Sequence, residues 1–377
     1  MNKKSLWTKN FILIMLVNFF AYFAFQLFPS ALPVYLKGLG ASDGVLGWLQ
    51  GILTIAVLIV RPISGIALDR YKRKGIFLAG MLGMLLVTAA YAFFPVVGII
   101  LVIRFAHGAV WGVANTACST VATDNVEKPR FAEGMGYFSL AASVGMAIAP
   151  AVALSLAMVN TVWLAVGFLA VSLVLVLLID YDVGAIPRSN EEKTRLAPYA
   201  KESALPAVIM FFMMITWGAV ITFLAVYGAQ RGIGNVGMFF TVYAVSLLLT
   251  RPVLGRLVDR HGFGAGIWPG VVLIPAALLL LSQSASLPMF LLCAGLYGVG
   301  IGAAQSSLQS MALVTVPKHR TGAANATFFT GFDAGIGLGA VIAGQVSAVL
   351  GYGNMFAWMA VFPLLAGGLY LLTRKRS

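Results

Sequence analysis

The stretch Arg61-Pro-Ile-Ser-Gly-Ile-Ala-Leu-Asp-Arg70 recurs 190 positions later as Arg251-Pro-Val-Leu-Gly-Arg-Leu-Val-Asp-Arg260. Glycines are common in this chain, and some would align by chance, but chance does not readily give a matched Arg-Pro-x-x-Gly-x-x-x-Asp-Arg. Without any gap, the same offset pairs Gly47 with Gly237, Gly108 with Gly298, Gly112 with Gly302, Gly145 with Gly335, and Arg130 with Arg320. We therefore expect two related halves, 1–180 and 204–377, joined by a polar linker, 181–203.

The composition predicts that both halves lie in a membrane. Hydrophobic residues make up 60% of the 377 positions and charged residues only 10%, with a mean hydropathy of +0.94. A soluble domain carries about 25% charged residues. The stretches 75–94 and 161–179 contain no charge, and about 20 helical residues span roughly 30 Å of hydrocarbon.

The apolar stretches predict an all-α membrane protein with twelve transmembrane helices. The first stretch, 11–36, is too long for a signal peptide and is expected to be retained. Cys118 and Cys293 lie inside apolar stretches, so the sequence predicts no disulfide framework and no metal site. The expected helices are 10–36, 44–69, 75–94, 97–121, 131–157, 161–180, 204–229, 236–259, 264–283, 287–314, 321–350 and 354–373.

The distribution of positive charge predicts the orientation. If the N-terminus is cytoplasmic, 20 of the 25 Lys and Arg residues fall in cytoplasmic segments, and only Lys37 and Arg231 fall in external loops. Cytoplasmic loops are enriched in Lys and Arg, so both termini are expected in the cytoplasm of a cell-membrane protein. This pattern accounts for the net charge of +13 and argues against nucleic-acid binding.

Several motifs resemble those of the major facilitator superfamily. Gly65-x-x-x-Asp69-Arg70-x-x-Arg73 looks like the signature between its second and third helices, although Lys72 stands where that pattern usually has glycine. The second copy, Gly255-x-x-x-Asp259-Arg260, keeps the later glycine but lacks the basic pair. Leu32-Pro33-Val34-Tyr35-x-x-x-Leu39-Gly40 looks like a motif of the twelve-helix drug:proton antiporter branch, and Gly145-x-x-x-x-Pro150 is a partial match to its antiporter motif.

The resemblance implies two parallel six-helix repeats around a central cavity. It also implies two conformational latches on the cytoplasmic side, in which Asp69 and Asp259 meet the positive N-terminal ends of helices from the other half. Gly65 would allow the close helix approach. The alternative is that these charges only anchor helix ends at the lipid headgroups. The latch residues are Gly65, Asp69, Arg70, Arg73, Gly255, Asp259 and Arg260.

Ionisable residues inside the membrane are rare and usually functional. Asp333 is the one acid expected well inside the hydrocarbon, at the depth of Arg104, and it is the leading candidate for proton coupling. A static ion pair, with Arg61 for example, is the alternative role. Arg104 and His107 lie one turn apart on one face, and Arg-x-x-His-Gly resembles the family's helix-4 motif. Arg61 and Arg251 occupy matched positions, which favours an architectural role, and Glu133 is a further candidate for coupling.

Other polar and aromatic side chains are candidates for lining the cavity, although such residues often only face neighbouring helices. They are Asn18, Tyr22, Gln26, Asn115, Trp217, Gln305 and Gln309.

The sequence therefore favours a secondary active transporter over an enzyme. It has no phosphate-binding loop and no nucleophile–base pattern, so an ion gradient is the expected energy source and no cofactor is expected. The leading interpretation is a monomeric, proton-coupled exporter of a small amphiphilic molecule. Three buried arginines against one aspartate favour a neutral or anionic substrate. The alternatives are a proton-linked importer, a dedicated metabolite exporter, or a non-transporting membrane sensor or scaffold.

Overall fold

The computed structural model describes residues 6–126, 131–181, 199–314, 316 and 321–374. The side chains of some predicted site residues lie outside this description: Asp69, Arg70, Glu133, Arg251, Gly255, Asp259 and Arg260.

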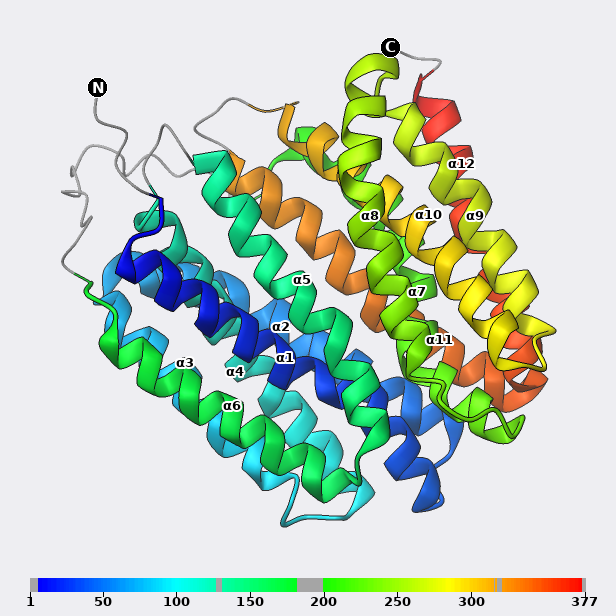
Figure 1. The fold of residues 1–377 in the computed structure, drawn as a ribbon, viewed down its shortest axis with the longest axis horizontal. Coiled ribbons are helices and arrows are strands. Elements are labelled where there is room, and N and C mark those ends of the chain that lie inside the picture. Colours follow the sequence, from blue (N-terminus) through cyan, green and yellow to red (C-terminus); the bar gives the residue numbers. More distant parts are fainter. Residues whose placement is uncertain (1–5, 127–130, 182–198, 315, 317–320, 375–377) are drawn as a thin grey trace. The chain divides into compact units, whose positions relative to one another are not determined.

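The described residues form twelve α-helices and one short 3-10 helix, and no strand occurs among them (Figure 1). The order is α1 (Lys9–Gly38), α2 (Asp43–Arg70), α3 (Arg73–Ala90), α4 (Val97–Asp124), α5 (Phe131–Ser155), α6 (Met158–Leu178), η3 (Lys201–Ser203), α7 (Ala204–Gln230), α8 (Met238–His261), α9 (Gly264–Ser282), α10 (Leu287–Val314), α11 (Thr321–Met359) and α12 (Val361–Arg374).

These helices confirm the predicted membrane architecture. Nine stretches of the described chain are long and apolar enough to cross a bilayer, and one of them, Thr327–Thr373, covers most of α11 and α12. The shorter apolar helices Leu140–Ser155 and Met238–Thr250 belong to α5 and α8. Gly351, at a φ of 76°, interrupts the helical backbone inside α11, directly after residue 350, where the sequence predicted the eleventh helix to end. Glycine tolerates this left-handed backbone because it has no β-carbon.

The chain divides into two compact units. Unit 1 comprises Met1–Phe28, Ile55–Ala149 and Leu156–Leu196, and unit 2 comprises Pro29–Thr54, Pro150–Ser155 and Ala197–Ser377. Three segments from the first half of the sequence therefore pack within unit 2: the end of α1, the start of α2 and the end of α5. Most of the predicted linker lies outside the described residues, so the predicted domain boundaries stay a prediction.

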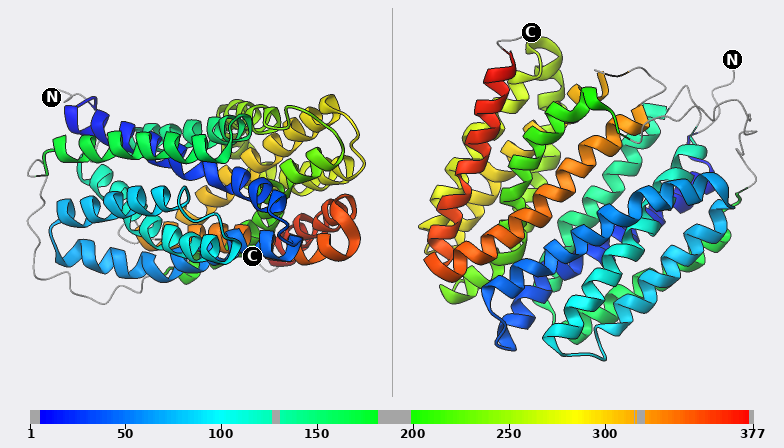
Figure 2. Two further views of the ribbon diagram at one scale, coloured as in Figure 1. Left: turned by 90° about the horizontal axis from the view of Figure 1, so that it is seen from below. Right: turned by 180° about the vertical axis from the view of Figure 1, so that it is seen from behind.

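Small residues and one asparagine hold unit 1 together. Helix α3 lies beside α4 and α6 (Figures 1 and 2), and a β-carbon at Gly80 would lie only 2.9 Å from the Ala114 nitrogen of α4. Asn10 of α1 donates to the Asn125 side chain at 3.1 Å and to the Asp180 carbonyl at 2.8 Å. Asn10 thereby joins the N-terminal end of α1 to the C-terminal ends of α4 and α6.

A glycine stripe sets the packing in unit 2, where α7 and α11 form the most extensive helix pair. Gly331, Gly335 and Gly339 of α11 recur every four residues, and β-carbons built on them would lie 2.1–2.4 Å from carbonyl oxygens of α7. Such spacing lets two membrane helices meet backbone to backbone. Helix α10 packs against both α8 and α9 (Figures 1 and 2).

Candidate functional site

Unit 1 encloses a guanidinium and an imidazole in the first half of α4. Arg104 is 1% exposed and His107 is fully buried, one turn apart on the same face as the sequence predicted. The rings of Phe25 and Phe28 approach the His107 ring edge-on, at 5.3 and 5.4 Å between centroids. The Arg104 guanidinium lies 5.9 Å from the Phe25 centroid, within reach of a cation–π interaction.

Tyr91, which the sequence did not single out, joins these two groups. It lies just after the end of α3, where its hydroxyl hydrogen-bonds Arg104 and lies 3.3 Å from Nδ1 of His107. A guanidinium only donates, so the hydroxyl accepts from Arg104 and its own proton is available to Nδ1. The three residues therefore form a buried hydrogen-bonded chain with a cation at one end.

Two predicted cavity residues of unit 1 come together beside this cluster. Asn115 donates to the Tyr22 hydroxyl at 3.1 Å, and both side chains are half-buried. The Tyr22 ring meets the ring of Trp111 edge-on at 4.9 Å. Asn18 instead donates to the Phe138 carbonyl at 2.8 Å, so it joins α1 to α5. Gln26 is buried in α1.

Unit 2 contains a different buried pair, Tyr297 and Thr216, and Tyr297 occupies the position that corresponds to His107 in the sequence repeat. Tyr297 of α10 lies 190 positions after His107, and its hydroxyl is 2.6 Å from the Thr216 hydroxyl. Thr216 donates to the Met213 carbonyl, so Tyr297 donates to Thr216. Trp217 stacks on the rings of Tyr243 and Tyr297 at 4.4 and 5.9 Å. Tyr297 was not among the predicted site residues, although the 190-residue offset from His107 could have pointed to it.

Asp333 lies on α11 and is half-buried. At 100° per residue it lies about 200° around the helix from Gly331, so it faces away from α7. Gly337, one turn further on, lies on the same face as Asp333, and a β-carbon there would meet Thr54 of α2 at 2.6 Å. Gln305 and Gln309 are half-buried on α10, and Arg61 is half-buried on α2.

The predicted latch motif is only partly visible. Arg73, at the start of α3, forms an ion pair with Asp124 at the end of α4, a partner that the sequence did not reveal. A β-carbon at Gly65 would meet no described atom within 4 Å, and the close helix approach predicted there stays a prediction. Nearby, the Lys74 ammonium lies 5.8 Å from the Tyr181 ring centroid, and burial raises the pKa of the Tyr181 hydroxyl.

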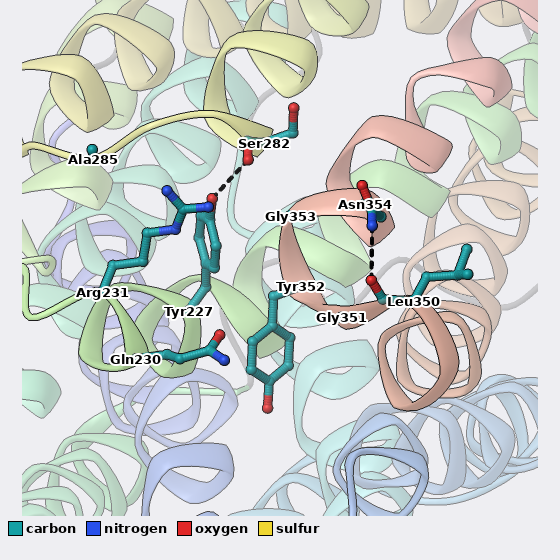
Figure 3. A pocket seen from close by; sticks show the side chains of 10 residues that line it. All are labelled: Tyr227, Gln230, Arg231, Ser282, Ala285, Leu350, Gly351, Tyr352, Gly353 and Asn354. Carbon is teal, nitrogen blue, oxygen red and sulfur yellow. Dashed lines mark hydrogen bonds between the residues drawn. The ribbon is translucent and has the colours of Figure 1, made fainter.

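Unit 2 also has an open pocket of about 660 Å³ where α7, the α9–α10 connection and the α11 turn meet (Figure 3). The Arg231 guanidinium lies 5.0 Å from the Tyr227 ring centroid, and the Tyr227 hydroxyl donates to the Ser282 carbonyl at 2.9 Å. Tyr352 and Asn354 line another side. None of the ten lining residues is acidic, so the pocket carries the positive charge of Arg231.

Apolar helices that carry a buried guanidinium, a buried imidazole and a half-buried carboxylate are characteristic of a membrane transport protein. The sequence signature of the Major Facilitator Superfamily matches residues 14–236 and 206–377, and the chain belongs to this superfamily of transporters.

Relatives match nearly the whole chain at low identity. An uncharacterised MFS-type transporter of Methanocaldococcus jannaschii is 23% identical over 98% of this chain and 99% of its own. The multi-drug resistance efflux pump PmrA of Streptococcus pneumoniae is 25% identical, covering 90% of each chain. Among solved structures, the nucleoside transporter NupG (D323A mutant) superimposes with a TM-score of 0.82 at 12% identity, covering 96% of this chain and 99% of its own.

Proposed function

We propose that this transporter exports a small amphiphilic molecule by alternating access, in exchange for protons bound at Asp333. The observation that carries the proposal is the position of Asp333: an acid on an apolar helix, on the face opposite the glycine stripe that fixes α11 to α7. Helix packing does not need a carboxylate at this position. The residue that corresponds to Asp333 in the first repeat, 190 positions earlier, is Ser143. A half-buried carboxylate whose surroundings change between conformations can load and release a proton.

The buried cation of unit 1 favours a neutral or anionic substrate. Arg104 is a desolvated cation, and its neighbours Tyr91 and His107 add no negative charge in their ordinary neutral forms. Aromatic rings around it provide apolar surface for the rest of an amphiphile. Export is supported by the likeness to an efflux pump and by the Pro-Val-Tyr motif at 33–35.

The charge distribution supports an orientation with both termini in the cytoplasm. In that orientation the two Gly-x-x-x-Asp-Arg motifs lie on the cytoplasmic side and serve as latches there. The Arg73–Asp124 pair supports this role, because it fixes the loop that carries the first motif to the end of α4.

Proton coupling is tested with purified protein in proteoliposomes under an imposed pH gradient. Accumulation of three probes is measured: neutral chloramphenicol, anionic fluorescein and cationic ethidium. We expect wild-type protein to accumulate the neutral or the anionic probe. Asp333→Asn should abolish gradient-driven accumulation while downhill exchange persists. Asp180→Asn, the same neutralisation at an exposed position after α6, is the matched control.

Thermal stability of the same variants separates proton coupling from a structural ion pair. Removing one partner of a buried pair leaves a buried charge and costs about 3–5 kcal/mol. Asp333→Asn protein with a normal melting temperature and no coupled flux supports coupling. A large fall in melting temperature with coupling intact assigns Asp333 to packing, and normal behaviour in both assays excludes both roles.

A further inference from the structure

We propose that the pocket where α7, the α9–α10 connection and the α11 turn meet binds a phosphate group, and that an anionic phospholipid supplies it (Figure 3). This binding site goes beyond the proposed export function and does not depend on it. All ten lining residues belong to unit 2. The volume of about 660 Å³ is typical of pockets that bind small molecules or parts of larger ones.

One arginine gives the pocket its charge. Arg231 directly follows the last residue of α7, and it forms no ion pair with the acidic residues that the structure describes. Its guanidinium lies 5.0 Å from the Tyr227 ring centroid, and an aromatic face attracts a cation without neutralising it. The charge therefore stays available to an anion, and a guanidinium can bind a phosphate through two parallel hydrogen bonds.

The Tyr227 ring beside this guanidinium is fixed in place. Tyr227 is 1% exposed, and its hydroxyl lies 2.9 Å from the Ser282 carbonyl oxygen and 3.2 Å from that of Leu281. The ring also stacks on Phe290 at 5.8 Å between centroids. Because the ring is held on both sides, it restricts the positions of the guanidinium, and less conformational freedom is lost when an anion binds.

A glycine keeps open the space beside the guanidinium. A β-carbon at Gly353 would lie 3.0 Å from the Ser282 carbonyl oxygen and 3.7 Å from a terminal nitrogen of Arg231, so a larger side chain would fill this space. The helical backbone is interrupted at Gly351 and resumes at Tyr352. The N-terminal end of a helical segment favours negative charge, so the backbone at this turn adds to the positive potential of Arg231.

The acidic side chain near this end of unit 2 already has partners. Asp43 is the one acid in the segments that the sequence predicts to be external. Its Oδ1 accepts a hydrogen bond from the Tyr352 hydroxyl at 2.6 Å and contacts the Lys37 ammonium. Since Lys37 balances Asp43, Arg231 remains as the net positive charge of these segments.

The position of the pocket favours a lipid headgroup over a soluble anion. The pocket lies at the ends of the apolar spans Lys201–Gln230 and Gly264–Ser282, where the hydrocarbon gives way to the headgroups. Leu350 lines the pocket and is 43% exposed, and its neighbour Val349 is 81% exposed. These apolar side chains can contact acyl chains while the guanidinium contacts the phosphate, whereas free phosphate would use the charged side alone.

The site is tested by isothermal titration calorimetry on the full-length protein in a neutral detergent. The probes are dioctanoyl phosphatidylglycerol, inorganic phosphate, and dioctanoylglycerol, which has the same acyl chains but no phosphate. We expect the wild type to bind phosphatidylglycerol more tightly than the other two. Arg231→Gln should weaken this binding about fivefold or more, because the charge-assisted hydrogen bonds to the phosphate are lost. Arg231→Lys keeps the charge and should bind with an intermediate affinity.

A second variant changes the pocket without removing the arginine. Gln230→Glu adds an acid to the lining with almost the same side-chain shape, and it should also weaken phosphatidylglycerol binding. Lys201→Gln removes an exposed cation elsewhere in unit 2. It is the matched control and should bind as the wild type does. Melting temperatures of all variants, measured without lipid, show that each is folded.

Equal affinities for phosphatidylglycerol in the wild type, Arg231→Gln and Gln230→Glu would overturn the phosphate site. An equal loss in Lys201→Gln would also overturn it, because binding would then follow net charge rather than the pocket. Binding of inorganic phosphate but not of phosphatidylglycerol, with a loss in Arg231→Gln, would overturn the lipid source and assign the site to soluble phosphate. The assay needs no transported substrate and no pH gradient, so its outcome is independent of the proton-coupled export tested above.

Discussion

The glycine stripe of α11 makes a quantitative prediction about stability. In Gly339→Ala, the new β-carbon would lie 2.1 Å from the Ile215 carbonyl oxygen, whereas ordinary contact begins at 3.4 Å. That oxygen belongs to the backbone of α7 and cannot rotate away. The two helices must therefore separate locally by roughly 1 Å, which forfeits about a quarter to a half of the dispersion energy of the affected contacts.

Overpacking of this kind costs about 1–3 kcal/mol, and replacing a helical glycine by alanine returns about 0.5–1 kcal/mol. We expect Gly339→Ala to lose about 1–2 kcal/mol of unfolding free energy. At about 2–4 °C per kcal/mol for a unit of this size, its melting temperature should fall by about 2–8 °C. Differential scanning fluorimetry on purified protein measures this shift.

Gly368→Ala is the matched control for this prediction. It makes the same substitution in α12 of the same unit, where a β-carbon would meet no described neighbour within 4 Å. Its melting temperature should stay level or rise slightly. A Gly339→Ala protein that melts at or above the temperature of Gly368→Ala would refute the argument that backbone contact across the stripe determines the packing.

Two further predictions concern unit 1. Reversing either charge in the Arg73–Asp124 pair should lower the unfolding free energy by only about 0.2–1 kcal/mol, because both groups are partly exposed. The melting temperature should fall slightly as a result. The exchange Arg73→Asp with Asp124→Arg should restore it, and a double variant no better than the single variants would contradict a direct pair. Tyr91→Phe should cost about 1–3 kcal/mol, since Arg104 loses a buried hydrogen-bond acceptor. Tyr71→Phe, at an exposed hydroxyl, should cost nothing measurable in the same fluorimetric assay.

The sequence alone determined the membrane architecture of this protein. Apolar runs of about 20 residues must be helical in lipid, because every backbone polar group has to be satisfied within its own segment. The twelve helices, the break near Gly351 and the repeat of 190 residues could therefore be read directly. The shared face of Arg104 and His107 also followed from helical periodicity, which depends only on positions within one helix.

Tertiary structure decided which side chains meet between helices. Tyr91 touches Arg104 and His107 from the end of α3, and Asp124 pairs with Arg73 across two helix ends. No periodicity relates such residues, because the distance between them depends on how neighbouring helices cross. Asp43 and Tyr352 lie 309 positions apart, and only the folded chain brings that carboxylate and that hydroxyl within 2.6 Å.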